Sequence, residues 1–290
     1  MTHRLPRFLL YPIAAVIPVL GLLAGLGSLG AAASASTRPA ASASAQAAAL
    51  AKAEIRRLRV GFHGTNHIVS PPVRHVSGLT QVQSTNWSGY ADTGSSFSKV
   101  TASWTEPSAT CSSRTESLAA FWVGIDGYSS GSVEQDGTLI ECYQRHAYQY
   151  TWWEMYPTNA IQVVGSSAAA GDHITASVVR SGGSYTLSVT DSTHSANSFT
   201  TTQACSGCAN TSAEWIAEAP SGSSGVLPLA QFSTWTDASS TVTQGGTSGV
   251  ISSFTDDEIT MINSSRAVKA QPGALNSSGN GFSVTWERAS

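Results

Sequence analysis

The amino-acid sequence predicts an all-β domain, an antiparallel sandwich or barrel, and three observations support this prediction. After Ser84, short runs rich in Val, Ile, Thr, Tyr, Phe and Trp alternate with clusters of Gly, Ser, Asn and Asp. The apolar residues there show almost no helical period. The stretch "TASVVRSGGSYTLSVT", residues 175–190, has the pattern of a hairpin, with two alternating strands around Ser-Gly-Gly-Ser.

The first residues have the order of a secretory signal peptide. Arg4 and Arg7 precede an apolar run, "FLLYPIAAVIPVLGLLAGLG", and small residues with an Ala-x-Ala site ending at Ala35 follow. The run is long enough to span a bilayer, so an uncleaved membrane anchor is the alternative. Pro12, Pro18 and the cleavage context favour a signal peptide over residues 1–35. We therefore expect a secreted, extracellular protein without stable membrane association.

A change in charge separates a pro-segment, residues 36–83, from the main domain, residues 84–290. Residues 1–83 carry eight Lys or Arg and one acid, a net charge of +7, and an alanine-rich part from Ala41 favours helix. Residues 84–290 carry seven Lys or Arg, seventeen acids and all eight tryptophans, a net charge of −10. The alternative is a disordered linker in place of a pro-segment. About 200 residues suit one domain, and its acidity argues against nucleic acid as a partner.

All four cysteines lie in the acidic part of the chain. An even count outside the cell indicates disulfides, and their order favours Cys111 with Cys142 and Cys205 with Cys208. A redox role for "CSGC" would need a βαβ context, and a zinc site would need four converging ligands. The sequence offers neither.

Two glutamates lie four residues apart in "AEWIAEAP", residues 213–220. In a strand, Glu214, Ile216 and Glu218 share one face, whereas the residues between them point to the other. Four strand residues span about 13 Å, which exceeds the roughly 5–9.5 Å between the paired carboxylates of a glycosidase. The two glutamates are therefore not expected to be each other's catalytic partners.

Aromatic and acidic side chains alternate in two other predicted strands. In "YTWWEMYP", Trp152, Glu154 and Tyr156 share one face, and in "FWVGIDG" Trp122 and Asp126 do the same. Burying such carboxyl groups without a partner costs several kcal/mol, roughly 2–7 for a polar group. We therefore interpret these strands as the floor of a groove that binds an extended polymer.

Four motifs in this order, "NWSGY", "FWVGIDGYSSGSVEQDG", "WWEMYP" and "AEWIAEAP", resemble those of the glutamic peptidases called eqolisins, with the bacterial branch closest. The resemblance covers about residues 84–290. It implies a concanavalin-like β-sandwich of two large antiparallel sheets that uses a glutamine and a glutamate, without metal or cofactor. Gln135 and Glu218 match this catalytic pair, and Glu214 does not. The residues that match the lining of the family's site are Trp122, Asp126, Trp152, Glu154 and Tyr156.

The resemblance implies an acid-acting endopeptidase with polypeptide substrates. Glu218 would take a proton from water and return it to the leaving amine, and the Gln135 amide would stabilise the oxyanion. Two departures, Asp136 after Gln135 and Met155 for a fungal Trp, affect specificity and pH optimum. We expect a monomer whose own basic pro-segment inhibits the acidic domain. The alternative is a secreted carbohydrate-binding, lectin-like module or a glycosidase.

Overall fold

The structure is a computed structural model, and it shows an all-β fold in the part of the chain that it describes. There, the helical segments are two short 3-10 turns, η2 (Ser195–Asn197) and η3 (Ile251–Ser253). None of the helices in this part is long and apolar enough to cross a membrane. The structure describes residues 68–76, 79–112, 114–165, 167–222 and 225–290. The expected signal peptide and most of the expected pro-segment lie outside these ranges.

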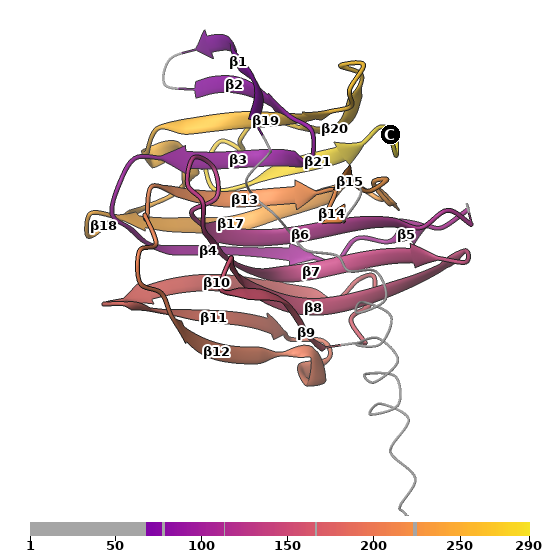
Figure 1. Ribbon diagram of the computed structural model, residues 1–290, viewed down its shortest axis with the longest axis horizontal. Coiled ribbons are helices and arrows are strands. Elements are labelled where there is room, and N and C mark those ends of the chain that lie inside the picture. The colour runs from indigo at the N-terminus through magenta and orange to yellow at the C-terminus, as the bar shows by residue number, and fades with distance from the viewer. Residues whose placement is uncertain (1–67, 77–78, 113, 166, 223–224) are drawn as a thin grey trace, which may run out of the picture. The chain divides into compact units, whose positions relative to one another are not determined.

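One large sheet runs from β1 to β9, from the top to the bottom of Figure 1. We call it the first sheet, and all of its pairs are antiparallel except β2 with β19, which are parallel. Residues 68–76 and 79–83 of the expected pro-segment supply the backbone of its two outermost strands. The order is β1 (Ile68–Val76), β2 (Leu79–Ser84), β19 (Asp256–Ile262), β3 (Trp87–Thr93), β13 (Ser212–Glu218), β6 (Ser117–Ile125), β7 (Val133–Tyr143), β8 (His146–Tyr156) and β9 (Asn159–Gly165).

A second sheet runs from β12 at the bottom of Figure 1 upwards to β18. Its order is β12 (Phe199–Ala204), β11 (Ser184–Asp191), β10 (His173–Ser181), β4 (Phe97–Thr105), β17 (Trp235–Gln244) and β18 (Thr247–Gly249). The predicted hairpin at 175–190 is confirmed, because β10 and β11 pair up to Ser181 and Ser184.

Shorter strands complete the fold. β20 (Val268–Pro272) and β21 (Phe282–Trp286) connect the C-terminal end of β19 in the first sheet to β17 of the second sheet. The two sheets are therefore connected by hydrogen bonds as well as by packing. Two further pairs are β5 (Ala109–Thr110) with β16 (Gln231–Phe232) and β14 (Ser221–Gly222) with β15 (Gly225–Val226).

Aromatic side chains from both sheets form the core between them. Phe121 of β6 packs against Trp235 of β17 with ring centroids 5.4 Å apart, and Trp235 also contacts Trp104 at 5.9 Å. Strands of the second sheet alternate between buried and more exposed positions, as in β10 and β11. This is the pattern of a sheet with one face on the core and one in solvent.

The central strands of the first sheet are buried on both faces. Almost every residue of β6, β7 and β13 is buried. On the face away from the core, a separate apolar cluster includes Trp87, Trp122, Trp152 and Ile216. We call this the site face. As alternation predicts, Glu214 and Glu218 accompany Ile216 on it, whereas the indole of Trp215 packs in the core.

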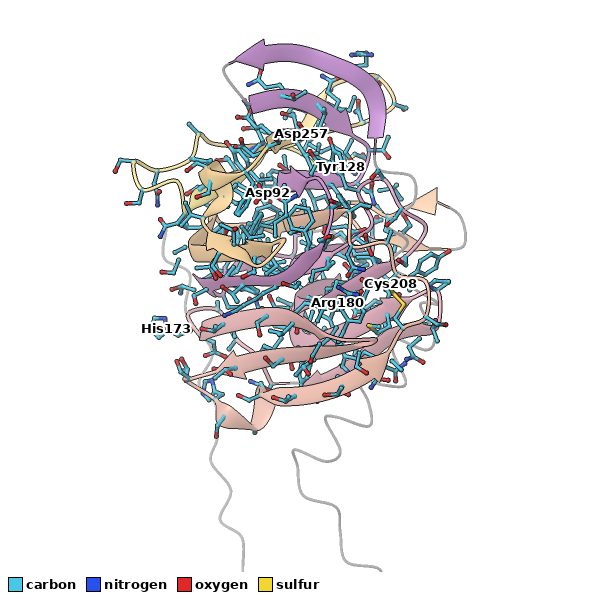
Figure 2. The ribbon with its side chains drawn as sticks, turned by 90° about the vertical axis from the view of Figure 1, so that its left-hand side faces the viewer. Asp92, Tyr128, His173, Arg180, Cys208 and Asp257 are labelled. Carbon is cyan, nitrogen blue, oxygen red and sulfur yellow. A yellow bond between two sulfur atoms is a disulfide. The ribbon has the colours of Figure 1, made fainter. Side chains whose placement is uncertain are left out.

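Both predicted disulfides are present. Cys111 is joined to Cys142 at the end of β7, and Cys205 is joined to Cys208 between β12 and β13. The second of these is drawn in yellow beside the Cys208 label in Figure 2. Each disulfide ties a loop to the end of a strand.

Gly137 occupies a position in β7 where no side chain fits. A Cβ atom there would lie 2.0 Å from the Phe121 carbonyl oxygen and 2.9 Å from the Trp122 Cβ. Because the nearest atom belongs to the backbone of β6, relief would require the two strands to separate. The absent side chain lets the strands pair closely beside Trp122.

Gly137→Ala is expected to destabilise the fold by about 1–3 kcal/mol or more, the usual cost of overpacking. Thermal unfolding followed by circular dichroism at pH 4 would measure the loss. The matched control is Gly131→Ala, because a Cβ at Gly131 meets nothing within 4 Å. Equal melting temperatures for Gly137→Ala and the wild type would contradict the close strand contact.

Candidate functional site

Strand register aligns the polar and aromatic residues of the site face in rows that run across four strands. The four neighbouring strands are, in order, β13, β6, β7 and β8. One row is Glu214, Gly124, Gln135 and Glu154, and the next is Ile216, Trp122, Gly137 and Trp152. Glu218 lies one row further, beside Ala120 of β6. Each of these two rows contains one glycine, and a Cβ atom at either glycine would meet Trp122.

Gln135 is held by Glu154 of the neighbouring strand. Its Nε2 donates a hydrogen bond of 2.7 Å to Glu154 Oε2, and the two residues are register partners. Both side chains are buried. The Gln135 Oε1 atom accepts no hydrogen bond from any of the described residues. The bond to Glu154 therefore fixes the amide orientation and leaves the carbonyl oxygen and one N–H for another partner.

Glu218 is held by two N–H donors from different strands. Trp122 Nε1 donates to Oε2 at 2.9 Å, and Asn86 Nδ2 donates to Oε1 at 3.0 Å. The Trp122 indole is itself packed edge-on against Trp87, with ring centroids 5.0 Å apart. Each carboxylate oxygen thus has a fixed donor, and the group cannot rotate freely.

Trp122 occupies the space between Glu218 and Gln135. Glu218 of β13 is the register partner of Ala120, and Gln135 of β7 is the register partner of Gly124, on opposite sides of β6. Ala120 and Gly124 are four residues apart, about 13 Å along the strand. The indole Nε1 contacts Glu218, while its Cζ3 atom would lie 2.8 Å from a Cβ at Gly124. That same Cβ would lie 3.3 Å from the Cβ of Gln135. The ring therefore reaches from one polar group to the neighbourhood of the other.

Burial dominates the electrostatics of the site. Glu218 is only 1% exposed, and its burial raises its pKa to about 8, although the N–H donors of Trp122, Asn86 and Trp87 act in the opposite direction. Burial also raises the pKa of Glu154 well above its usual range, with the bond from Gln135 opposing the shift and the charge of Glu218 adding to it. Burial therefore favours the protonated form of both carboxyl groups.

Asp126 lies where the chain leaves β6, close enough to Glu214 for its charge to add to burial in raising the pKa of that residue. It follows the last residue of β6 with a φ of 69°, so the alternation of the strand ends before it. Its carboxylate accepts hydrogen bonds from the backbone N–H groups of Asn210 (2.7 Å) and Thr211 (2.9 Å). In this structure Asp126 anchors the segment that leads into β13.

The remaining expected residues, Trp152 and Tyr156, both belong to β8. Trp152 is fully buried in the apolar cluster, and Tyr156 is half-buried where β8 ends. Tyr156 lines a pocket of ≈ 300 Å³ together with Glu134 and the Cys205–Cys208 loop. The Tyr128 hydroxyl donates a hydrogen bond to Asp257. Both residues are labelled in Figure 2, near the end of the first sheet that β1 and β2 form.

Two contributors to the site were missed in the sequence. Asn86 and Trp87 lie in the motif "NWSGY", which carried the resemblance but received no role. Both come from β3 or the turn before it, on the other side of β13 from β6. A polar residue next to a tryptophan in a motif is the signal that could have drawn attention to them.

Two groups of side chains in the described part of the chain have metal-ligand types close together. Glu134 lies near Cys205 and Cys208, and Asp172 lies near Asp191 and His194. The cysteines are oxidised to a disulfide and offer no thiolate. In the second group, the His194 Nδ1 and Asp172 Oδ1 atoms contact each other at 2.8 Å. Neither group lies among the residues that hold Gln135 or Glu218.

The fold and the site define a class: a two-layered β-sandwich that presents a fixed amide and fixed carboxyl groups on one aromatic sheet face. The sequence profile of the peptidase A4 family matches residues 85–285. Because this match covers more than half of the chain, the protein belongs to that family, the glutamic peptidases called eqolisins. The family resemblance found in the sequence motifs is confirmed.

Relatives with known names agree with this membership. Aspergillopepsin-2 of Aspergillus niger is 26% identical to this chain over 185 residues. The matched region covers 56% of this chain and 66% of aspergillopepsin-2, so the chain spans slightly less than two thirds of that relative. Scytalido-glutamic peptidase, solved with a transition state analog inhibitor, is 24% identical, with a TM-score of 0.60 over 70% of this chain and 98% of its own. For aspergilloglutamic peptidase from Aspergillus niger the identity is 25% and the TM-score 0.50, over 59% and 99%. These structures share the sandwich fold.

Burial also raises the pKa of carboxyl groups outside the site face. Burial raises the pKa of Glu106 to about 8 and those of Asp92 and Glu134 to about 9. The pKa of Asp136 is also raised well above its usual range by burial. A raised folded-state pKa adds stability that is complete below the unfolded-state pKa, near 4, and is lost as pH rises through the folded-state value.

We therefore expect the melting temperature to be highest in acid and to fall as the pH rises from about 5 to about 9. Asp136→Asn should reduce this fall, because asparagine is nearly isosteric and cannot ionise. Differential scanning calorimetry across this pH range would measure it, with the exposed Glu287→Gln as control. An identical fall in wild type and Asp136→Asn would contradict the role of buried carboxyl groups.

Proposed function

We propose that this protein is an acid-acting endopeptidase that hydrolyses peptide bonds with Gln135 and Glu218. The observation that carries the proposal is the fixed placement of both groups on one aromatic face, Glu218 by Trp122 and Asn86 and Gln135 by Glu154. Membership of the peptidase A4 family supports it. The relative scytalido-glutamic peptidase binds a peptide-based transition state analog, which supports polypeptides as the substrate class here.

Glu218 and Gln135 have different roles in the proposed hydrolysis. Ionised Glu218 takes a proton from a water molecule as that water attacks the scissile carbonyl, and later gives the proton to the leaving amine. The free N–H of the Gln135 amide donates to the oxyanion of the tetrahedral intermediate. Because the nucleophile is water, no covalent acyl-enzyme forms.

Glu154 is proposed to position Gln135 and not to react. A primary amide has two N–H groups and one carbonyl oxygen, and rotation by 180° would exchange them. The bond from Nε2 to Glu154 selects one orientation. A donor held in advance stabilises the transition state without reorganising during the reaction.

The aromatic residues are proposed to bind the substrate chain. Trp122 and Trp152 flank Gly137 in one row, and Tyr156 lies at the end of β8 next to a pocket. Indole and phenol rings bury a large area with little loss of conformational freedom. A polypeptide that crosses this row would contact both Glu218 and Gln135.

The full-length chain is proposed to be an inactive precursor. Gln135 and Glu218 are each only 1% exposed, so a polypeptide could not reach them without a rearrangement. In this closed state the pKa of Glu218, about 8, keeps the intended base protonated. Opening the site face to water would remove the main cause of that shift and restore a carboxylate that works in acid.

The basic part of the sequence is the proposed inhibitor. Residues 1–83 carry a net charge of +7 and residues 84–290 a net charge of −10, so the two parts attract each other. Acidification neutralises exposed carboxylates and weakens this attraction. Secretion through the signal peptide would deliver the precursor to the outside of the cell, where it would act as a monomer.

Glu218→Gln and Gln135→Ala should each lower proteolysis of denatured casein at pH 3–4 by about 100-fold or more. The first substitution removes the base and the second removes the oxyanion donor. Glu214→Gln is the matched control, because it lies on the same strand and face but outside the proposed pair. Comparable loss in Glu214→Gln would overturn the assignment of Glu218.

The same assay separates the proposal from its alternatives. An aspartic peptidase inhibitor such as pepstatin should leave the activity unchanged. Binding to polysaccharide without any casein cleavage would favour a carbohydrate-binding module instead, and release of sugars would favour a glycosidase.

The purified precursor should shorten itself on transfer from pH 7 to pH 3–4, and casein cleavage should rise as it does so. Intact-mass spectrometry over time would follow both species, and the Glu218→Gln precursor should keep its length. A wild-type precursor that stays full length in acid while cleaving casein would contradict inhibition by the pro-segment.

A further inference from the structure

Asn86 connects the start of the main domain to Glu218. Its side-chain Nδ2 donates to Glu218 Oε1 at 3.0 Å, and its backbone oxygen accepts from Ala219 N–H at 2.8 Å. Both bonds reach β13 next to the proposed base. Asn86 is only 1% exposed, so water does not compete for the amide.

Ser84 holds the turn that places Asn86. Its Oγ accepts hydrogen bonds from the backbone N–H groups of Asn86 (3.2 Å) and Trp87 (2.9 Å) and donates to Asn86 Oδ1 at 3.2 Å. The bond to Oδ1 fixes the flip state of the Asn86 amide, so that the Nδ2 atom faces Glu218. Ser84 is completely buried.

β2 anchors Ser84 to the sheet. All six residues, Leu79–Ser84, pair with β19 in continuous register. Val82 is 5% exposed and belongs to the apolar cluster of Trp87 and Ile259. The Gln81 Nε2 donates to Glu258 Oε1 at 3.0 Å, while the Tyr90 hydroxyl donates to the other oxygen of that carboxyl group at 3.1 Å.

We propose that Asn86 is a positioning residue for Glu218, held by Ser84, and that β2 is therefore retained when the pro-segment is removed. This inference rests on the proposed function. It places the start of the mature domain at or before Leu79, five residues earlier than the change in sequence composition indicates. The segment 79–83 is then structural and the removable inhibitor ends upstream of it.

Cleavage after Gln83 would damage the site in two ways. It would create a positively charged α-amino group on the completely buried Ser84, and an unpaired buried charge is costly. It would also remove Val82 from the apolar cluster and Gln81 from Glu258. The turn that places Asn86 would lose its attachment on one side.

The first test is the pH profile of casein cleavage by Asn86→Ala, matured from the full-length precursor. The Asn86 N–H stabilises the carboxylate form of Glu218, so its loss should move the acidic limb of kcat/KM upward by about one pH unit. Asn86→Asp keeps the shape and replaces the donor with an acid, so it should shift the limb in the same direction. Ser84→Ala should give a smaller upward shift.

The matched control is Gln83→Ala, because Gln83 lies on the same strand and its side chain contacts the exposed Arg266. This variant should keep the wild-type profile. An unshifted acidic limb in both Asn86 variants, with the wild type active, would overturn the positioning role. An inactive wild type would instead overturn the proposed function itself.

The second test is the N-terminal residue of the mature enzyme. The full-length precursor is acidified until casein activity is constant, and intact mass with N-terminal sequencing then identifies the first residue. A start at or before Leu79 supports the inference. Fully active enzyme that starts after Leu79 would overturn the retention of β2.

Discussion

The burial of carboxyl groups in their neutral form is the constraint on which this structure depends. Glu154, Glu214 and Glu218 lie on one face of the first sheet, and Asp136 lies on the other, all nearly free of solvent. An ionised carboxylate in such surroundings costs far more than a protonated one, and burial is the largest cause of each raised pKa. The fold is thus one that protons stabilise. A protein built in this way suits acidic surroundings, because there its interior is uncharged.

The same constraint explains how the site is organised. Under the proposed mechanism Glu218 must ionise in order to act, and it then needs donors that offset its burial; Trp122 and Asn86 supply them. Gln135 carries no charge and can be buried at lower cost, held by a single bond to Glu154. Glycines at 124 and 137 leave the space that the Trp122 indole fills. The reactive groups are therefore placed by backbone register and by an aromatic ring, and both are rigid.

Access to the site connects this electrostatic state to maturation. In this structure the carboxyl group of Glu218 is buried and its neutral form is favoured, which under the proposed function would keep the precursor inactive. Removal of an inhibitory segment would hydrate the face and create the carboxylate in one step. The hydrogen bonds from Ser84 to Asn86 and from Asn86 to Glu218 are the reason for proposing that such a cut leaves β2 in place. In that proposal, the strand next to the removable segment also supports the base.

Local pattern was sufficient to predict the all-β class, the hairpin at 175–190, both disulfides and the faces of Glu214 and Glu218, because strand alternation and cysteine order are properties of short segments. It was insufficient for the hydrogen bonds that Asp126 accepts from the backbone N–H groups of Asn210 and Thr211, which lie 84 and 85 residues away. It was also insufficient for Asn86, which meets Glu218 from 132 residues away. The amino-acid sequence by itself determined the family, the two-sheet class and the residue types available for chemistry. Only the tertiary structure decided which donor faces which carboxyl group and how deeply each is buried, because both depend on register between strands that are distant in the chain.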